Sequence, residues 1–240
     1  MTEKVPYVIR GRSLKRKWGE QWDTQLMTYL ENLGPIFILK DKLARNRGKR
    51  CLIVGAASET NLVSKFTHDI IGINISRKEL KKINLKTGLI LGDAQNLPIR
   101  KSSVDFIVCK STLHHLNNPD AALLEMNRVL RKEGYIVLYE PGLLNPIAFV
   151  GRELFPTNIH ESSEKPFNPI SLRKLLSKRF QVIMEKNFFV FVHVVPILAK
   201  KLSFLRSKRL LSAFSNLDNL LCKTFLKNLC WIMVFELKNK

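Results

Sequence analysis

The hydrophobic positions of this chain alternate between short continuous apolar runs and longer stretches in which apolar residues recur every three or four positions. A continuous apolar run is typical of a strand that is buried on both faces of a parallel sheet, whereas the longer period indicates a helix that covers the sheet. The continuous runs are CLIVG (51–55), DIIGIN (69–74), GLIL (88–91), VDFIVC (104–109) and YIVLYE (135–140). Helical patterns separate them, and the longest covers residues 119–130. This alternation predicts an α/β fold with a doubly wound, mostly parallel sheet.

The chain before the first of these runs has a helical and basic pattern. It extends from residue 13 to about residue 46, and Gly34 and Pro35 break it into two pieces. We expect residues 1–47 to form an N-terminal helical lead-in, or cap, to a single domain over residues 48–240.

The last third of the chain has a different pattern. Residues 180–195 and 229–237 form two longer apolar runs that predict strands, and two strands so far apart in sequence can pair antiparallel at a sheet edge. Residues 188–229 predict an apolar and basic helical insertion above the strand ends. The proline-rich residues 143–169 are expected to form an extended surface loop beside it.

The composition is strongly basic. Forty Lys and Arg residues against 20 Asp and Glu give a formal net charge of +20, which favours anionic partners such as nucleic acid or acidic lipid headgroups. The charges are spread along the chain, so a solvated basic surface without a specific partner explains them equally well.

The cysteines and the longest apolar segment limit where the protein can act. The four cysteines have no C-x-x-C spacing, so we expect reduced core residues of a cytoplasmic protein and no metal site. Residues 188–199, which contain His193 and Pro196, are too short to cross a bilayer, and no apolar segment follows residue 1. A secreted or membrane-spanning protein is therefore not expected.

Polar residues or glycine follow the predicted strands at the edge where ligands bind to open parallel sheets. Gly55 allows a tight turn, and the next helix directs its amides toward a ligand carboxylate. Asn74 is placed to bind a ribose, and Asp93 to accept a hydrogen bond from an adenine amino group beside the Ala94 amide. Lys110 follows the fourth strand at the same edge.

Five segments between residues 92 and 135 together resemble a known family. They are GDAQNLPI (92–99), SVDFIV (103–108), LHHL (113–116), NP (118–119) and EMNRVLRKEGY (125–135). Their order and spacing are similar to the class I S-adenosylmethionine-dependent methyltransferases, closest to the branch with the ubiquinone and menaquinone methyltransferases. The resemblance covers about residues 50–141 and implies a Rossmann-like, seven-stranded sheet whose last strand is antiparallel. It implies S-adenosylmethionine as the cofactor, bound by Gly55, Ala56, Ala57, Asn74, Ile75, Asp93, Ala94 and Lys110.

The chain departs from the family pattern in the first turn and after the second strand. Ile53 and Asn74 stand where the family usually has acidic residues, and Ala57 and Glu59 replace its second and third glycines. S-adenosylmethionine carries no phosphate and needs fewer backbone amides than a dinucleotide, so binding with reduced affinity is expected. A module that no longer binds the cofactor and instead binds a partner is the alternative.

The reaction would be an in-line attack of an acceptor oxygen, nitrogen or carbon on the sulfonium methyl group. His115, after the fourth strand, is the candidate base, although a hydrogen bond to a loop carbonyl explains it equally well. His114 is expected to be structural, and Glu140 either contacts the substrate or lies at the surface. His160 and His193 can reach the site only if their segments fold over it.

Two features predict the acceptor, namely the turn after the fourth strand and the insertion. Residues 109–112 read CKST rather than the Asp/Asn-Pro-Pro-aromatic turn of enzymes that methylate adenine amino groups. The insertion combines apolar residues with lysines and arginines, as in a lid that also rests on an anionic membrane. Leu217, Leu220, Leu221 and Phe225 share a helical face that is either part of this lid or buried core. We therefore expect a small or lipid-like acceptor and peripheral contact with anionic membrane, with an RNA methyltransferase as the alternative; the oligomeric state stays open.

Overall fold

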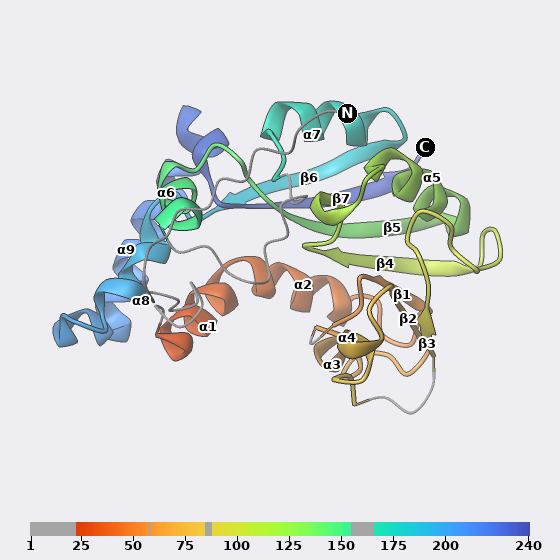
Figure 1. The fold of residues 1–240 in the computed structure, drawn as a ribbon, viewed down its shortest axis with the longest axis horizontal. Coiled ribbons are helices and arrows are strands. Elements are labelled where there is room, and N and C mark those ends of the chain that lie inside the picture. The colour runs from red at the N-terminus through yellow and green to blue at the C-terminus, as the bar shows by residue number, and fades with distance from the viewer. Residues whose placement is uncertain (1–22, 58, 85–87, 155–165) are drawn as a thin grey trace, which may run out of the picture.

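The computed structural model describes residues 23–57, 59–84, 88–154 and 166–240. These residues form one seven-stranded sheet of order β3-β2-β1-β4-β5-β7-β6 (Figure 1). Strands β1 to β5 are parallel, and β7 lies antiparallel between β5 and β6, so the predicted fold class and the terminal antiparallel pair are confirmed. The strands are β1 (Cys51–Val54), β2 (Ile70–Asn74), β3 (Leu89–Leu91), β4 (Val104–Lys110), β5 (Leu130–Pro141), β6 (Phe180–Phe188) and β7 (Ile232–Asn239).

Helices cover both faces of the sheet, and alternate residues of one strand point into two separate cores. Ile53 of β1 packs in the core that α1 (Thr24–Leu33) and α2 (Pro35–Ala44) complete, whereas Leu52 packs in the core below α5 (Pro119–Val129) and α7 (Pro169–Ser177). Figure 1 shows these helix pairs on opposite sides of the sheet. Two short helices, α3 (Thr60–Val63) and α4 (Arg77–Leu80), follow β1 and β2. The division at residue 47 stays a prediction, although α1 and α2 share the core of the sheet.

The two predicted pieces of the lead-in are α1 and α2, and they meet at Gly34 as expected. Proline occupies the first turn of α2, α5 and α7, where its missing N–H costs no helical hydrogen bond. Asp23 caps α1 by accepting bonds from the amides of Gln25 and Leu26. The beginning of the predicted lead-in, residues 1–22, lies outside the described residues.

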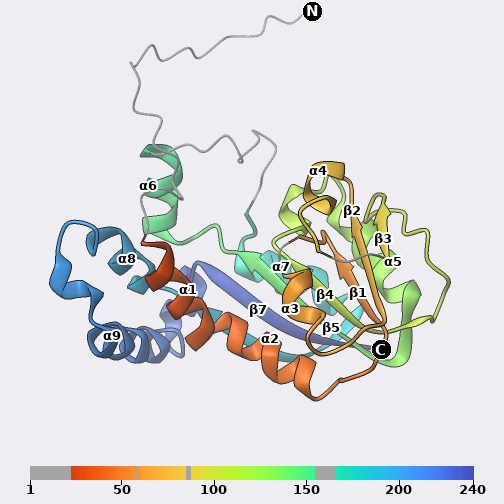
Figure 2. The ribbon, with the colours of Figure 1, turned by 90° about the horizontal axis from the view of Figure 1, so that it is seen from below.

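The expectation of an extended loop over residues 143–169 is wrong for its first part. Residues Pro146–Leu154 form α6, which lies off the carboxyl end of β5 (Figure 2). Asn145 explains where the helix begins, because its Oδ1 accepts a hydrogen bond from the Ala148 amide at 2.7 Å. His160 lies outside the described residues.

The predicted strand over residues 180–195 ends early, at Phe188. Phe189 has a φ of 70°, which turns the chain out of the sheet. The buried carboxylate of Asp218 then accepts hydrogen bonds from the amides of Val190, Phe191 and Val192, at 2.8 to 3.0 Å. These amides would otherwise need a partner strand, so this contact ends β6.

The insertion between β6 and β7 is helical, as predicted. It contains the 3₁₀ turn η3 (Val192–Val194), α8 (Val195–Leu198), η4 (Ser203–Arg206), α9 (Lys208–Leu221) and η5 (Phe225–Leu229). Leu217, Leu220 and Phe225 are 49%, 59% and 84% exposed, so the interpretation of this face as core is wrong for these three residues. None of the helices in the described ranges is long and apolar enough to cross a membrane.

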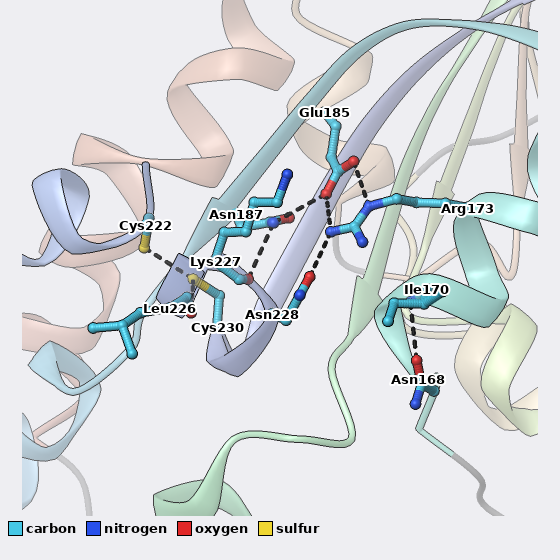
Figure 3. Close-up of polar contacts among 10 residues, drawn as sticks. All are labelled: Asn168, Ile170, Arg173, Glu185, Asn187, Cys222, Leu226, Lys227, Asn228 and Cys230. Atoms are coloured by element: carbon cyan, nitrogen blue, oxygen red, sulfur yellow. Dashed lines mark hydrogen bonds and ion pairs between the residues drawn. The ribbon is translucent and has the colours of Figure 1, made fainter. Parts of the chain in front are cut away.

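A polar network joins α7 to β6 and η5 at the far edge of the sheet (Figure 3). Arg173 donates two hydrogen bonds of 2.6 Å to Glu185 and one of 2.9 Å to Asn228. Beside it, the sulfur atoms of Cys222 and Cys230 lie 3.0 Å apart. All four cysteines are free and buried, as predicted.

His193 makes the folded state sensitive to acid. Its side chain is fully buried against Trp231, at a ring centroid distance of 5.0 Å, and burial lowers its pKa from 6.5 to about 4. The unfolded chain therefore binds a proton below pH 6.5 that the folded chain does not bind until about pH 4, so stability is lost as the pH falls through this window. At pH 5 the free energy of unfolding should be about 2 kcal/mol lower from this group alone. Urea denaturation at pH 7 and pH 5 tests this, because His193→Phe should lack that loss; equal losses in both proteins would contradict it.

Candidate functional site

A cavity of about 500 Å³ lies at the carboxyl ends of β1, β2 and β4. This volume is in the range of small-molecule sites. All the site residues predicted from the sequence except Ala56 line it, namely Gly55, Ala57, Asn74, Ile75, Asp93, Ala94, Lys110 and His115. Ala56 is fully buried in the core instead, and its backbone forms part of the turn that follows β1. Residues 188–229 contribute no lining side chain within the described part of the cavity wall, so the insertion does not form a lid there.

The turn after β1 requires a glycine only at Gly55. Its φ is +75°, and a Cβ atom there would lie 2.0 Å from Thr112 Oγ1. Ala57 and Glu59, at the other two glycine positions of the family pattern, are absent from the residues with positive φ. The close approach of β1 to the loop after β4 is thus preserved with a single glycine.

Asn74 ties the end of β2 to the turn after β1. Its Nδ2 donates to the Ala56 carbonyl oxygen at 3.0 Å, and its Oδ1 accepts from the Ser76 amide at 2.8 Å. A carboxylate could not donate to Ala56, so asparagine has a structural role here that the usual acidic residue could not fill. One Nδ2 hydrogen and one Oδ1 lone pair remain for a ligand.

Asp93 is held in a fixed orientation by Gln95. Its Oδ1 accepts from the Gln95 amide at 2.8 Å, and its Oδ2 lies 3.1 Å from Gln95 Nε2. Gln95 in turn accepts a hydrogen bond from the Asn118 amide, which begins α5. The carboxylate keeps acceptor positions for a ligand in the cavity that it lines.

Glu140 and His114 support the wall of the cavity from behind. Glu140 is fully buried, so the prediction of a surface role is wrong, and it is not among the residues that line the cavity. Its Oε1 accepts hydrogen bonds from the amides of Thr112 and Leu113, and its Oε2 lies 2.7 Å from His114 Nδ1. The structural role predicted for His114 agrees with this geometry, and His115, whose ring centroid lies 4.0 Å from that of His114, lines the cavity.

The cavity is acidic although the chain is basic. Among the described residues, Glu59, Glu79 and Asp93 line it together with a single lysine, Lys110. S-adenosylmethionine carries two positive charges, on its sulfonium and ammonium groups, and one negative charge. The residues present therefore fit this cofactor, since an excess of carboxylates stabilises a cationic ligand.

Residues 52–138 match the family model described as a methyltransferase domain. This stretch contains β1 except its first residue, β2 to β4, most of β5 and every described residue that lines the cavity. This part of the chain is therefore similar to methyltransferase domains.

The curated relatives of this chain are distant. A demethylmenaquinone methyltransferase of Staphylococcus saprophyticus is 34% identical over 95 residues, 36% of this chain and 41% of that protein. An uncharacterised protein of Methanocaldococcus jannaschii is 30% identical over 116 residues, 48% of this chain and 52% of that protein. The chain thus spans about half or less of the length of these two relatives.

Solved structures support the fold of the chain. A S-adenosylmethionine-dependent methyltransferase from Archaeoglobus fulgidus superimposes with a TM-score of 0.57 and 15% identity, covering 90% of this chain and all of that one. A protein from Pyrococcus horikoshii gives a TM-score of 0.59 at 12% identity, covering 91% of this chain and 92% of that one. At these identities the similarity shows the fold alone.

Sequence reasoning missed several residues that line the cavity. Glu59, Glu79, Gln95 and Thr112 were not among the predicted site residues. Glu59 had a signal, since it stands where the family pattern has a glycine. Thr112 had none, because its role depends on the approach of the loop after β4 to Gly55.

Proposed function

We propose that the protein is an S-adenosylmethionine-dependent methyltransferase that acts on a small or lipid-like acceptor. The acidic cavity beside the Gly55 turn carries this proposal. It lies at the carboxyl ends of the strands, where ligands of such sheets bind, and its negative charge is complementary to a sulfonium. In this assignment Asp93 and the Ala94 amide hold the adenine, and Asn74 holds the ribose. Bound cofactor supplies an electrophilic methyl group.

The chain's own residues position the acceptor and exclude water. The walls of the cavity are held by buried contacts such as Glu140 to His114, so little rearrangement is needed on binding. His115 is the candidate to accept a proton from an acceptor that must lose one, since it is the histidine that lines the described cavity.

A lipid-like acceptor is favoured by apolar side chains beyond the end of β5. Leu143 and Leu144 follow that strand after Gly142 and are 40% and 39% exposed, and Phe149 and Val150 of α6 are about half exposed. Strand β5 neighbours β4, whose carboxyl end forms part of the cavity wall. An apolar molecule lying on this surface would approach the cavity from the adjacent strand.

The insertion favours peripheral contact with an anionic membrane. Residues 195–229 contain seven lysines and arginines and one acidic residue, Asp218, which is fully buried. Exposed apolar side chains, including Phe204 and Phe225, lie among these cations. The combination suits a bilayer with acidic headgroups, where each cation near the surface contributes about 1 kcal/mol.

Sedimentation with lipid vesicles tests the membrane contact. The protein should bind phosphatidylglycerol vesicles and not phosphatidylcholine vesicles. Salt at about 0.5 M should release it from the anionic vesicles. Lys223→Ala combined with Lys227→Ala should weaken binding several-fold, because Lys223 follows α9 and Lys227 lies in η5, on either side of the exposed Phe225 in sequence. Indifference to anionic vesicles, with salt-sensitive retention on RNA, would favour the RNA alternative instead.

Asp93→Ala tests the cofactor assignment. Loss of a hydrogen bond to the adenine should weaken S-adenosylmethionine binding by about 1–3 kcal/mol, or roughly 5- to 150-fold. Isothermal titration calorimetry measures this directly. Unchanged affinity would place the adenine elsewhere, and no binding of cofactor to the unmodified protein at millimolar concentration would favour a silent module.

A further inference from the structure

Glu59 is a buried carboxylate in the turn where the family pattern has glycine. Only 9% of the residue is exposed, yet it lines the cavity. Its Oε1 accepts a hydrogen bond from the Ala57 amide at 2.8 Å. Burial raises the pKa of Glu59, and the amides of Glu59 and Ala57 partly oppose that rise. Burial of this carboxylate costs free energy that a glycine or a glutamine at the same position would not cost.

The Glu59 side chain changes what the turn can bind. Backbone amides at such a turn form a site for an anion. Here the Glu59 carboxylate already occupies the Ala57 amide, so an anionic group of a ligand is excluded from that position. The turn therefore offers a negative charge where the family pattern offers bare amides.

Lys110 provides the opposite charge across the same cavity. It ends β4, whose Cys109 pairs with Val54 of β1, so the two charged residues follow neighbouring strands. The positive charge of Lys110 stabilises the ionised carboxylate of Glu59 and so lowers the pKa of Glu59. Within the described part of the chain, however, neither residue forms an ion pair. A carboxylate and an ammonium that face one cavity without pairing are complementary to a zwitterion.

We propose that Glu59 and Lys110 bind the amino-acid end of the cofactor, with Glu59 holding its ammonium group and Lys110 its carboxylate. This assignment rests on the proposed function. It gives the ammonium a partner although Ile53 replaces the usual acidic residue, and that isoleucine is fully buried in the core. In the turn after β1, the Glu59 side chain would thus bind a cation, whereas the backbone amides of the family pattern would bind an anion.

Three ligands separate this role from a general effect of charge. S-adenosylmethionine has the ammonium, carboxylate and sulfonium groups. S-adenosylhomocysteine lacks the methyl group and with it the sulfonium charge, and 5′-methylthioadenosine lacks both the sulfonium charge and the whole amino-acid end. Calorimetry with Glu59→Gln should show affinities about 10- to 100-fold lower for the first two ligands and unchanged for the third. Lys110→Met should give the same pattern. Glu133→Gln, the same chemical change at an exposed ion pair with Lys238, is the matched control and should change none of them.

The melting temperature without ligand shows whether Glu59 is merely structural. Glutamine can still accept the Ala57 amide, and it removes a desolvated charge, so Glu59→Gln should not lower the melting temperature at pH 7. A lower melting temperature, with weaker binding of all three ligands, would overturn the assignment in favour of a capping role for Glu59. Unchanged binding of S-adenosylmethionine and S-adenosylhomocysteine would overturn it as well, and so would weaker binding of S-adenosylmethionine alone, which would indicate the sulfonium as the partner. If the unmodified protein binds none of the three ligands, the proposed function fails first.

Discussion

Gly55→Ala should reduce the affinity for S-adenosylmethionine by at least about 100-fold and should also lower the stability of the fold. A Cβ atom at this position would lie 2.0 Å from Thr112 Oγ1, 2.8 Å from Thr112 Cγ2 and 2.9 Å from Thr112 Cβ. The loop after β4 cannot retreat without breaking the bonds from the Thr112 and Leu113 amides to Glu140. The turn must therefore move into the cavity, where it blocks the ligand. Calorimetry measures the affinity, and urea denaturation the loss of stability.

Gly48→Ala is the control that separates backbone strain from steric overlap. Gly48 has a φ of +73°, close to that of Gly55, but a Cβ atom there would meet no atom within 4 Å. The alanine variant should lose about 1 kcal/mol of stability and keep its cofactor affinity. Combining Gly55→Ala with Thr112→Ala removes the two closest contacts and should restore part of the binding. Equal effects of the Gly48 and Gly55 variants would contradict the steric explanation.

Glu140→Ala should lower the free energy of unfolding by about 3–5 kcal/mol. The fully buried carboxylate has three partners, the amides of Thr112 and Leu113 and the His114 ring, and alanine leaves all three without a partner in the core. The total stability of a domain is about 5–15 kcal/mol, so the variant should be close to unfolding at about 37 °C. Urea denaturation gives the value.

Glu140→Gln distinguishes shape from charge at the same position. Glutamine keeps an oxygen for the two amides and loses the charged partner of His114, so it should cost less than half as much as alanine. Because His115 adjoins His114, the alanine variant should also weaken cofactor binding. A loss below about 1 kcal/mol for alanine would show that the loop after β4 does not depend on this carboxylate.

The strands of the sheet were predictable because strands that are buried on both faces appear in the sequence as continuous apolar runs. The runs at residues 51–55 and 104–109 match β1 and β4 to within one residue, since both faces of these strands are covered and no polar alternation interrupts them. The end of β6 was not predictable in this way. Residues 189–195 are as apolar as a strand, and the residue that turns them aside is Asp218, which lies far along the chain.

The candidate site was predictable in its position and not in its charges. The carboxyl ends of adjacent parallel strands must meet, so Gly55, Asn74, Asp93 and Lys110 gather at one cavity. Whether an acidic residue is exposed or buried depends on tertiary contacts. Glu140 and Glu59 are both buried, and the local sequence of neither shows it.

The contrast between an acidic cavity and a basic exterior bears on turnover under the proposed function. Methyl transfer removes one positive charge from the cofactor, whereas Glu59, Glu79 and Asp93 stay in place. The spent molecule is then less attracted than the fresh one, and the difference favours its exchange. Inhibition by accumulated product would consequently be weak, and an enzyme of this kind could keep working where demethylated cofactor is cleared slowly.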